Sequence, residues 1–185
     1  MGKWLISVAL VVGLLAASSP VAAPEVAMAP IHVAPPSLES LQRRRISNAL
    51  TSVGVDSSVS EEWAEIFWRY GEQTGVSSEL LVALAYKESD LIETAHNPND
   101  PSWGLMQVMP KWWEHSFVRE CGVEGTPENL VVAEHGICYG AHVFKHFLTK
   151  FDGDVTKALS GYNTGRPTPT VYSRRITEAR SDLFF

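Results

Sequence analysis

The sequence contains little cysteine, no internal repeat and little positive charge for its length. Its 185 residues include 15 Lys and Arg against 21 Asp and Glu, which gives a formal net charge of −6. Binding to nucleic-acid phosphates needs a basic surface, so this balance argues against a nucleic-acid partner. No glycine-rich phosphate loop is present, and the basic cluster at 43–45 is more typical of a solvated helix face.

Only two cysteines are present, Cys121 and Cys138. If the chain is exported, both lie in an oxidising compartment, where a disulfide between them would add about 3 kcal/mol of stability. A catalytic thiol is the weaker alternative, because neither sequence neighbourhood supplies an obvious activating partner. We therefore treat the pair as a disulfide candidate.

Residues 1–23 have the layout of a signal peptide. Lys3 precedes an apolar run from Leu5 to Ala17, and small residues follow up to Ala23. The run is short for a membrane span, which needs about 20 residues. The sequence therefore predicts an exported protein of the periplasm or cell envelope, with no stable membrane span after processing. An uncleaved anchor is the alternative.

The rest of the chain divides into a linker and a helical domain. Residues 24–57 read as a Pro- and Ala-rich linker with an N-terminal helix from Ser37, and residues 58–185 as one domain. Strand signals are confined to "GLMQV", so the fold class is α+β, predominantly α-helical, with a minimal β element. Further helices are expected from Ser58 or Ser60 to Gly71 or Gly75, from Ser77 or Ser78, along a stripe from Ile137 to Phe151, and after a cap at Asp154.

The apolar faces of these helices follow from helical spacing. In the helix from Ser37 the recurring residues are Leu38, Leu41, Ala49, Leu50 and Val53; in the next they are Trp63, Ile66, Phe67 and Tyr70; after Asp154 they are Val155, Ala158, Leu159 and Tyr162. Gly136 and Gly140 lie a turn apart, which would let a neighbouring backbone come close.

One apolar helical stripe ends in a carboxylate. Leu81, Leu84, Ala85 and Glu88 recur at i, i+3, i+4 and i+7. A carboxylate desolvated on one side has a raised pKa, so it can hold a proton near neutral pH and deliver it, as cleavage of a glycosidic bond requires. The alternative is that Glu88 simply caps or extends from a helix end.

Three blocks of sequence give Glu88 a chemical context. They are "ESD" at 88–90, "SWGLMQVMP" at 102–110 and "SGYNTG" at 160–165, in that order. Together they resemble the SLT-type (family 1) lytic transglycosylases, with goose-type lysozymes as more distant relatives. The resemblance covers roughly residues 75–175 and implies a single lysozyme-like domain.

The resemblance implies that Glu88 is the single catalytic acid and base. Gly104 would permit a close backbone approach, Gln107 would offer a donor and an acceptor to a sugar, and Tyr162 would point its hydroxyl toward the cleavage site or Glu88. Alternatively, Met106 fills the core and Tyr162 belongs to a buried helix stripe. The implied substrate-binding residues are Ser89, Asn97, Ser102, Gly104, Met106, Gln107, Tyr162 and Asn163.

The activity implied by the resemblance is non-hydrolytic cleavage of peptidoglycan. An exported lytic transglycosylase would break the MurNAc–GlcNAc β-1,4 bond and form 1,6-anhydro-MurNAc, without a cofactor. Its partners would be peptidoglycan glycan strands and an envelope-spanning secretion or conjugation apparatus. Hydrolysis needs a second carboxylate facing Glu88, and a helix end turns neither Asp90 nor Glu93 reliably toward it. If Asp100 faces the cleft, a hydrolytic muramidase or chitinase is the alternative. A non-catalytic peptidoglycan-binding assembly factor is a third reading, against which the intact Glu88 argues.

Two other groups of residues have the type and spacing of a possible site. His142 and His146 lie at i, i+4, but Val143 stands where a zinc-protease helix has its glutamate, so no metal is predicted. Trp103, Trp112 and Trp113 are candidates for stacking on sugar faces, although at least one is expected in the core.

Overall fold

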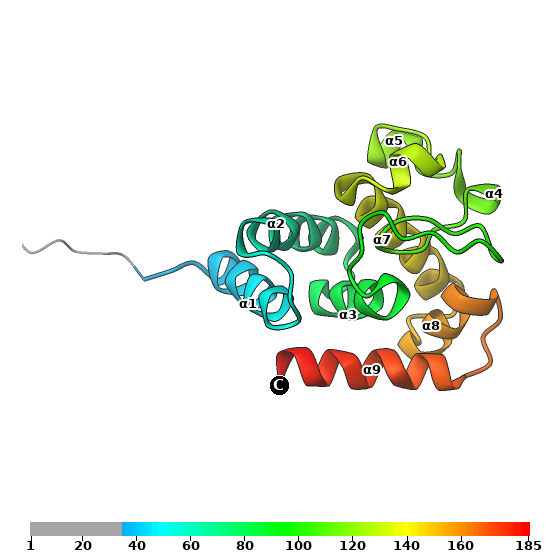
Figure 1. Cartoon of the computed structure of the whole chain (residues 1–185). Helices are drawn as coiled ribbons and strands as arrows, with labels where there is room; N and C mark the ends of the chain where they lie inside the picture. Colours follow the sequence, from blue (N-terminus) through cyan, green and yellow to red (C-terminus); the bar gives the residue numbers. More distant parts are fainter. Residues whose placement is uncertain (1–34) are drawn as a thin grey trace, which may run out of the picture. The chain divides into compact units, whose positions relative to one another are not determined.

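The computed structural model describes residues 35–185, of which Pro36–Phe185 form one compact unit. The signal-peptide prediction for residues 1–23 lies outside the described residues. No helix in the described part combines the length and apolar character needed to cross a membrane. The helices of this unit (Figure 1) are α1 Leu38–Ser52, α2 Ser57–Thr74, α3 Ser78–Ser89, α4 Pro110–Trp113, α5 Val118–Cys121, α6 Pro127–Leu130, α7 Ala133–Lys150, α8 Val155–Thr164 and α9 Val171–Phe184.

Helix α3 lies at the centre of the core. Every residue from Leu80 to Ala85 is at most 5% exposed, and α1, α2, α7 and α9 all pack against it. A helix that is apolar all round is buried all round, so α3 is more enclosed than its single predicted stripe indicated. Ser77 caps its first turn, as predicted, by accepting a hydrogen bond from the Leu80 amide.

Helix α1 belongs to the same compact unit and packs on α2. Its buried face consists of Ile46, Ala49 and Leu50. Leu38 and Leu41, which the periodicity placed on this face, are exposed because the first turns of the helix extend past its packing partners.

Helix α2 confirms the predicted stripe and corrects its start. Trp63 and Tyr70, with the two apolar residues between them on this face, are buried. The cap is Asp56 rather than Ser58 or Ser60, because the Asp56 carboxylate accepts the Ser58 amide. The helix ends at Gly75, whose φ of 68° is the left-handed conformation that glycine adopts without strain.

Helix α7 makes the close approaches predicted for its two glycines. A Cβ at Gly136 would lie 2.6 Å from the Leu130 carbonyl oxygen, and one at Gly140 would lie 2.4 Å from the Met106 Cβ. The first contact is with a neighbouring backbone, as expected, and the second with a side chain. Met106 is therefore core filler against α7, as the alternative interpretation held.

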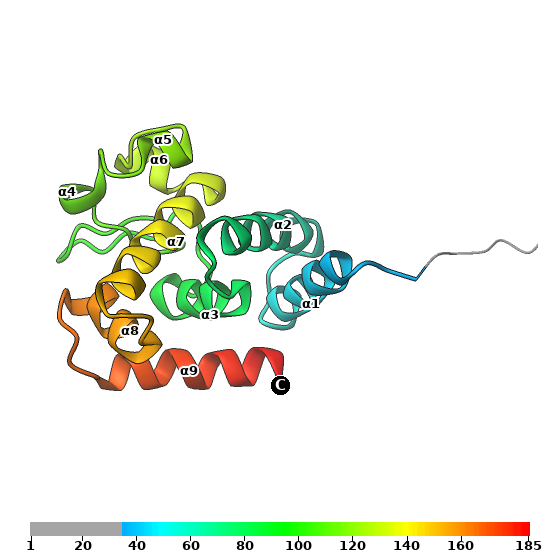
Figure 2. The same cartoon turned by 180° about the vertical axis from the view of Figure 1, so that it is seen from behind.

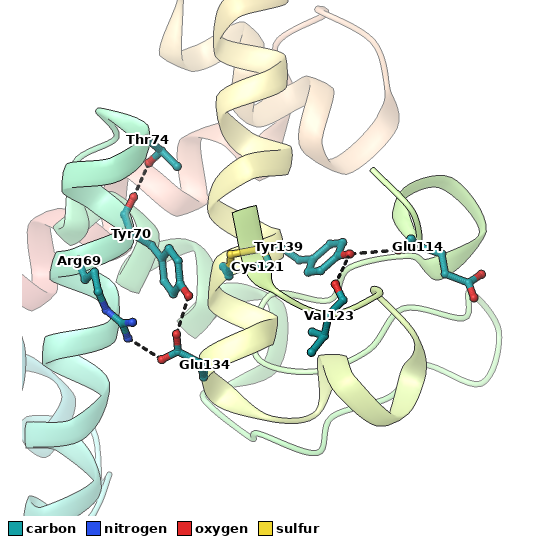
Figure 3. The surroundings of a disulfide bond; sticks show 9 residues. Arg69, Tyr70, Thr74, Glu114, Cys121, Val123, Glu134 and Tyr139 are labelled. Atoms are coloured by element: carbon teal, nitrogen blue, oxygen red, sulfur yellow. Dashed lines mark hydrogen bonds and ion pairs between the residues drawn. A yellow bond between two sulfur atoms is a disulfide. The ribbon is translucent and has the colours of Figure 1, made fainter. Parts of the chain in front are cut away.

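Cys121 and Cys138 form a disulfide that ties α5 to α7, as Figure 3 shows. Beside it, the Tyr139 hydroxyl lies 3.0 Å and 2.9 Å from the carbonyl oxygens of Glu114 and Val123. On the other side of α7, Glu134 accepts hydrogen bonds from Arg69 and Tyr70 of α2. Helix α7 is thus fixed to both the core and the segment that carries α4 and α5.

The remaining elements of the fold are the β-bridges and helix α9. Within residues 35–185, β pairing is confined to two isolated antiparallel bridges, His96 with Trp103 and Trp103 with Val108. Helix α9, for which no prediction was made, lies against α3 and α8 (Figure 2). It buries Ile176 and Ala179 on that side. Val155 of α8 is exposed, although the periodicity placed it inside.

Candidate active site

The last turn of α3 leads from the core into a cleft of about 570 Å³, a volume typical of ligand sites. Glu88 lines this cleft, so the carboxylate at the end of the apolar stripe faces a cavity and not bulk solvent. Helices α4, α7 and α8 and the 97–109 loop supply the rest of the wall. Its residues are Glu88, Asn97, Asp100, Ser102, Gln107, Val108, Met109, Trp112, Trp113, Val143, Phe147, Gly161, Tyr162, Asn163, Thr164 and Gly165.

Burial raises the pKa of the Glu88 carboxyl from its ordinary 4.5 to about 7. The opposing influence is smaller: the Tyr172 hydroxyl donates a hydrogen bond to Glu88 Oε1, which lowers the pKa. Desolvation therefore dominates, and the neutral acid is populated near neutral pH. This is the protonation state that a general acid needs.

Tyr162 lies close to Glu88 without bonding to it. Its hydroxyl donates a hydrogen bond of 2.6 Å to the Met106 carbonyl oxygen. Burial and the nearby Glu88 charge raise the pKa of Tyr162 well above its usual value, so the hydroxyl stays protonated. This bond fastens α8 to the loop of Met106, and Tyr162 lines the same cleft as Glu88.

Three residues implied to bind substrate lie behind the cleft wall. The Ser89 hydroxyl donates to the carbonyl oxygens of Ala85, at 3.1 Å, and Leu105, at 2.9 Å, and so joins the end of α3 to the loop. Gly104 has φ 75°, and a Cβ there would lie 1.9 Å from the Leu130 carbonyl oxygen. Met106 is fully buried. Within the structure, these residues shape the loop that carries Gln107.

Gln107 lines the cleft, but its amide is engaged within the loop. Its Nε2 donates to the carbonyl oxygens of Ala95 and Gly104, at 3.1 Å and 3.0 Å, and its Oε1 accepts from the Ser102 hydroxyl at 2.7 Å. Gln107 also has φ 46°, an unusual conformation for a non-glycine residue. The side chain thus holds the turn in shape, and Ser102 is the serine of this loop that bonds to it.

The sequence of this chain matches a known protein family. The family model described as "Transglycosylase SLT domain" matches residues 65–180, which is more than half of the chain. The chain belongs to this family. The matched range contains Glu88 and the cleft-lining residues of α4, α7 and α8.

Two similar proteins bear on this SLT domain. It is 29% identical over 110 residues to the peptidoglycan transglycosylase gp16 of Escherichia phage T7, a match covering 60% of this chain and 8% of that protein. Its fold resembles an inactive mutant of the lytic transglycosylase Slt from Pseudomonas aeruginosa, with a TM-score of 0.50 and 17% identity. That match covers 79% of this chain and 28% of the other. The fold is therefore lysozyme-like and mostly helical, as predicted, and the chain spans a small part of each relative.

Sequence reasoning missed one residue of the SLT domain's site, Tyr172. It comes from α9, 84 residues after Glu88, and its pKa is raised well above the usual value by burial and by the Glu88 charge. Tyr172, Ile176 and Ala179 lie at i, i+4 and i+7, so they share one face of α9. This spacing is the feature of the sequence that could have pointed to Tyr172, and it indicates only that its side chain faces inward.

The other carboxylates considered beside Glu88 have different positions. The Glu93 Oε1 accepts the Ala133 amide at 2.7 Å and so caps the first turn of α7. Asp90 is exposed at the end of α3. Asp100 does line the cleft with Glu88, so it remains the candidate for a second carboxylate.

The two histidines of α7 contact different aromatic rings. His142 stacks on Phe117 with ring centroids 5.3 Å apart, and His146 meets Trp113 edge-on at 5.2 Å. Burial lowers the pKa of His142, which keeps that ring neutral near neutral pH. Both rings therefore have a structural explanation as part of the aromatic packing around α4 and α7.

The raised pKa of Glu88 predicts a pH-dependent stability difference. Because the folded-state pKa lies above the ordinary value, ionisation of Glu88 favours the unfolded chain as pH rises from about 4.5 to about 7. Glu88→Gln has no such ionisation, so its melting temperature relative to wild type should rise between about pH 5 and about pH 8. Calorimetric melting curves across this range test the expectation, and parallel pH profiles for the two proteins would contradict it.

Proposed function

We propose that the chain is an exported lytic transglycosylase that cleaves peptidoglycan glycan strands, with Glu88 as its single acid and base. The observation that carries the proposal is a carboxyl group with a pKa of about 7 at the wall of a cleft, next to two protonated tyrosines. Family membership supports the reaction class. The name of the phage protein supports peptidoglycan as the substrate.

The reaction requires one group that both gives and takes a proton. Neutral Glu88 donates its proton to the oxygen between MurNAc and GlcNAc as that bond breaks. The resulting carboxylate then accepts the proton of the MurNAc 6-hydroxyl, whose oxygen bonds to C1. A 1,6-anhydro-MurNAc end and a free GlcNAc hydroxyl result, no water is consumed, and Glu88 returns to its starting state. A pKa of about 7 suits both steps.

Tyr172 positions the carboxyl group through this cycle. Its hydroxyl donates to Glu88 Oε1, so it restrains the rotamer of Glu88 and stabilises the carboxylate after proton transfer. The bond of Tyr162 to the Met106 carbonyl holds α8 and the loop at a fixed separation on the facing wall.

Export places the enzyme where its substrate is. The predicted signal in residues 1–23 would deliver the domain to the periplasm or cell envelope. There, local opening of the wall would serve an envelope-spanning secretion or conjugation apparatus. No cofactor enters the proposed reaction.

Hydrolysis is the second candidate function, because Asp100 lines the same cleft as Glu88. A carboxylate opposite the acid could activate water, as in inverting glycosidases. Mass spectrometry of the fragments released from purified peptidoglycan separates the two reactions. Anhydro ends support transglycosylation, reducing ends support hydrolysis, and the absence of released fragments would contradict both.

The hydrogen bond from Tyr172 predicts a shift in the pH profile. Because this bond lowers the Glu88 pKa, Tyr172→Phe should raise it, and kcat/KM should fall at a higher pH than in wild type. The maximal rate should drop by about tenfold, since the carboxyl is less restrained. The measurement is initial rates of strand cleavage across pH. A profile that keeps its position would show that Tyr172 does not act on Glu88.

A further inference from the structure

The disulfide between α5 and α7 (Figure 3) has a histidine beside it, so three potential metal ligands lie together. His142 comes one turn after Cys138 on the same face of α7, and Cys121 is the last residue of α5. One potential ligand atom of each residue lies within 4.8 Å of the other two. Cys138 is fully buried and Cys121 nearly so, which shields both sulfurs from bulk solvent.

The His142 ring is held by packing, while one of its nitrogens has no partner. The ring stacks on Phe117 with centroids 5.3 Å apart, and Phe117 directly precedes α5. Within the described residues, the buried His142 Nε2 makes no hydrogen bond. A buried polar atom without a partner requires an explanation, and a role of this imidazole as a metal ligand supplies one.

The separations of the three donor atoms fit a zinc ion. Zn–S bonds are about 2.3 Å long, Zn–N bonds are about 2.0 Å long, and the preferred geometry is tetrahedral. Two sulfurs on one zinc ion are therefore about 3.8 Å apart, and a sulfur and a nitrogen about 3.5 Å. Both values lie inside the 4.8 Å that encloses the donor atoms. Small side-chain rotations therefore suffice once the sulfur–sulfur bond is broken.

We propose that Cys121, Cys138 and His142 form a Zn²⁺ site in the reduced protein, with a water molecule as the fourth ligand. A dithiol reductant takes over the disulfide bond, and its two protons convert the cysteine sulfurs to thiols. Zn²⁺ then binds two thiolates and the neutral imidazole, and the two thiol protons pass to solvent. Two sulfurs and one nitrogen are a soft donor set, which selects Zn²⁺ over Mg²⁺ and Ca²⁺.

The bound ion replaces the covalent link between α5 and α7 by a coordinate one. Both links tie the segment of α4 and α5 to α7, whose Val143 and Phe147 line the cleft. The zinc site therefore keeps this wall of the cleft in place under reducing conditions, in which the bridge is lost.

The test compares Zn²⁺ binding by the oxidised and the reduced full chain. The chain is stripped of metal, reduced with a dithiol, freed of the reductant without air, and shown to contain two free thiols. Calorimetric titration should then give one Zn²⁺ per reduced chain and none per oxidised chain. Co²⁺, used as a spectroscopic substitute, should show thiolate-to-cobalt charge-transfer absorption. Added Zn²⁺ should also raise the denaturant midpoint of the reduced chain alone.

His142→Gln is the decisive variant, because it removes the nitrogen ligand and leaves the cysteine pair intact. It should weaken Zn²⁺ binding by the reduced chain at least about 100-fold, since loss of a ligand costs no less than loss of an outer-shell partner. The unfolding curve of its oxidised form shows whether the variant folds.

Two further histidine variants are matched controls. His146→Gln changes the same residue type one turn further along α7, outside the donor cluster. His115→Ala removes the histidine of a second group of potential ligands, which lies with Glu114 and Glu124 and is largely exposed. Both variants should bind Zn²⁺ as the wild type does.

The possible outcomes decide the proposal in either direction. One Zn²⁺ per reduced chain, with the charge-transfer absorption and its loss in His142→Gln, supports the site. No binding, or equal binding by the oxidised chain, would overturn it. An equal loss in His142→Gln and His146→Gln would also overturn it, because that result indicates binding to an unfolded chain. None of these measurements uses peptidoglycan, so the result is independent of the proposed function.

Discussion

Glu88→Gln is expected to reduce the release of anhydro-ended fragments from peptidoglycan by about 10²- to 10⁴-fold, the usual contribution of a general acid or base. Glutamine keeps the size of the side chain and an acceptor for the Tyr172 hydroxyl, but it has no proton to transfer. Strand binding should therefore remain while turnover is lost. The measurement combines mass spectrometry of the products with a pull-down on insoluble peptidoglycan.

Asp90→Asn is the matched control for this substitution. It also replaces a carboxylate by an amide at the end of α3, but Asp90 is exposed and does not line the cleft. Its activity should stay close to that of wild type. If Glu88→Gln keeps most of its activity, the reaction uses another proton donor, and Asp100 is the next residue to test.

Replacing both cysteines with serine is expected to lower the free energy of unfolding by about 3 kcal/mol. The disulfide closes a loop with a sequence separation of 17 residues. Closing a loop of this size lowers the conformational entropy of the unfolded chain, which stabilises the folded state by about 3 kcal/mol. Denaturant unfolding curves test this expectation through the transition midpoint. Under reducing conditions the wild type should shift to the midpoint of the double variant, which itself should not respond to reductant.

A midpoint that is the same in the variant and the wild type would contradict a stabilising role for the bridge. Removing the bridge should affect more than stability, because it ties α5 to α7 close to the aromatic packing of Trp113 on Phe117. Loss of the bridge should therefore also loosen the packing of α4 beside the cleft.

Periodicity predicted the helices whose apolar faces meet the core. Trp63 and Tyr70 of α2 and Phe144 of α7 are buried as their spacing indicated. It failed for Leu38 and Leu41, because a pattern within one helix does not tell where its packing partner ends. Helix α9 was not predicted, since charged residues interrupt its apolar positions and only its face toward α3 and α8 is buried.

The sequence located the candidate acid of the site but not the contacts around it. Glu88 followed from a local pattern, a carboxylate in line with an apolar stripe, and the structure supplies the burial that raises its pKa. Tyr172 lies 84 residues away, and only the packing of α9 brings its hydroxyl to the carboxyl group. The internal bonds of Gln107 depend on the conformation of its own loop, which no spacing rule describes.

The most direct test of the account is the pKa of Glu88 itself. A ¹³C NMR titration of the side-chain carboxyls, with the Glu88 signal identified by its absence from Glu88→Gln, reports the protonation state without substrate. We predict a midpoint of about 7 for Glu88. A midpoint near the ordinary 4.5 would mean that the carboxyl is ionised under working conditions, and it would contradict the assignment of Glu88 as the proton donor.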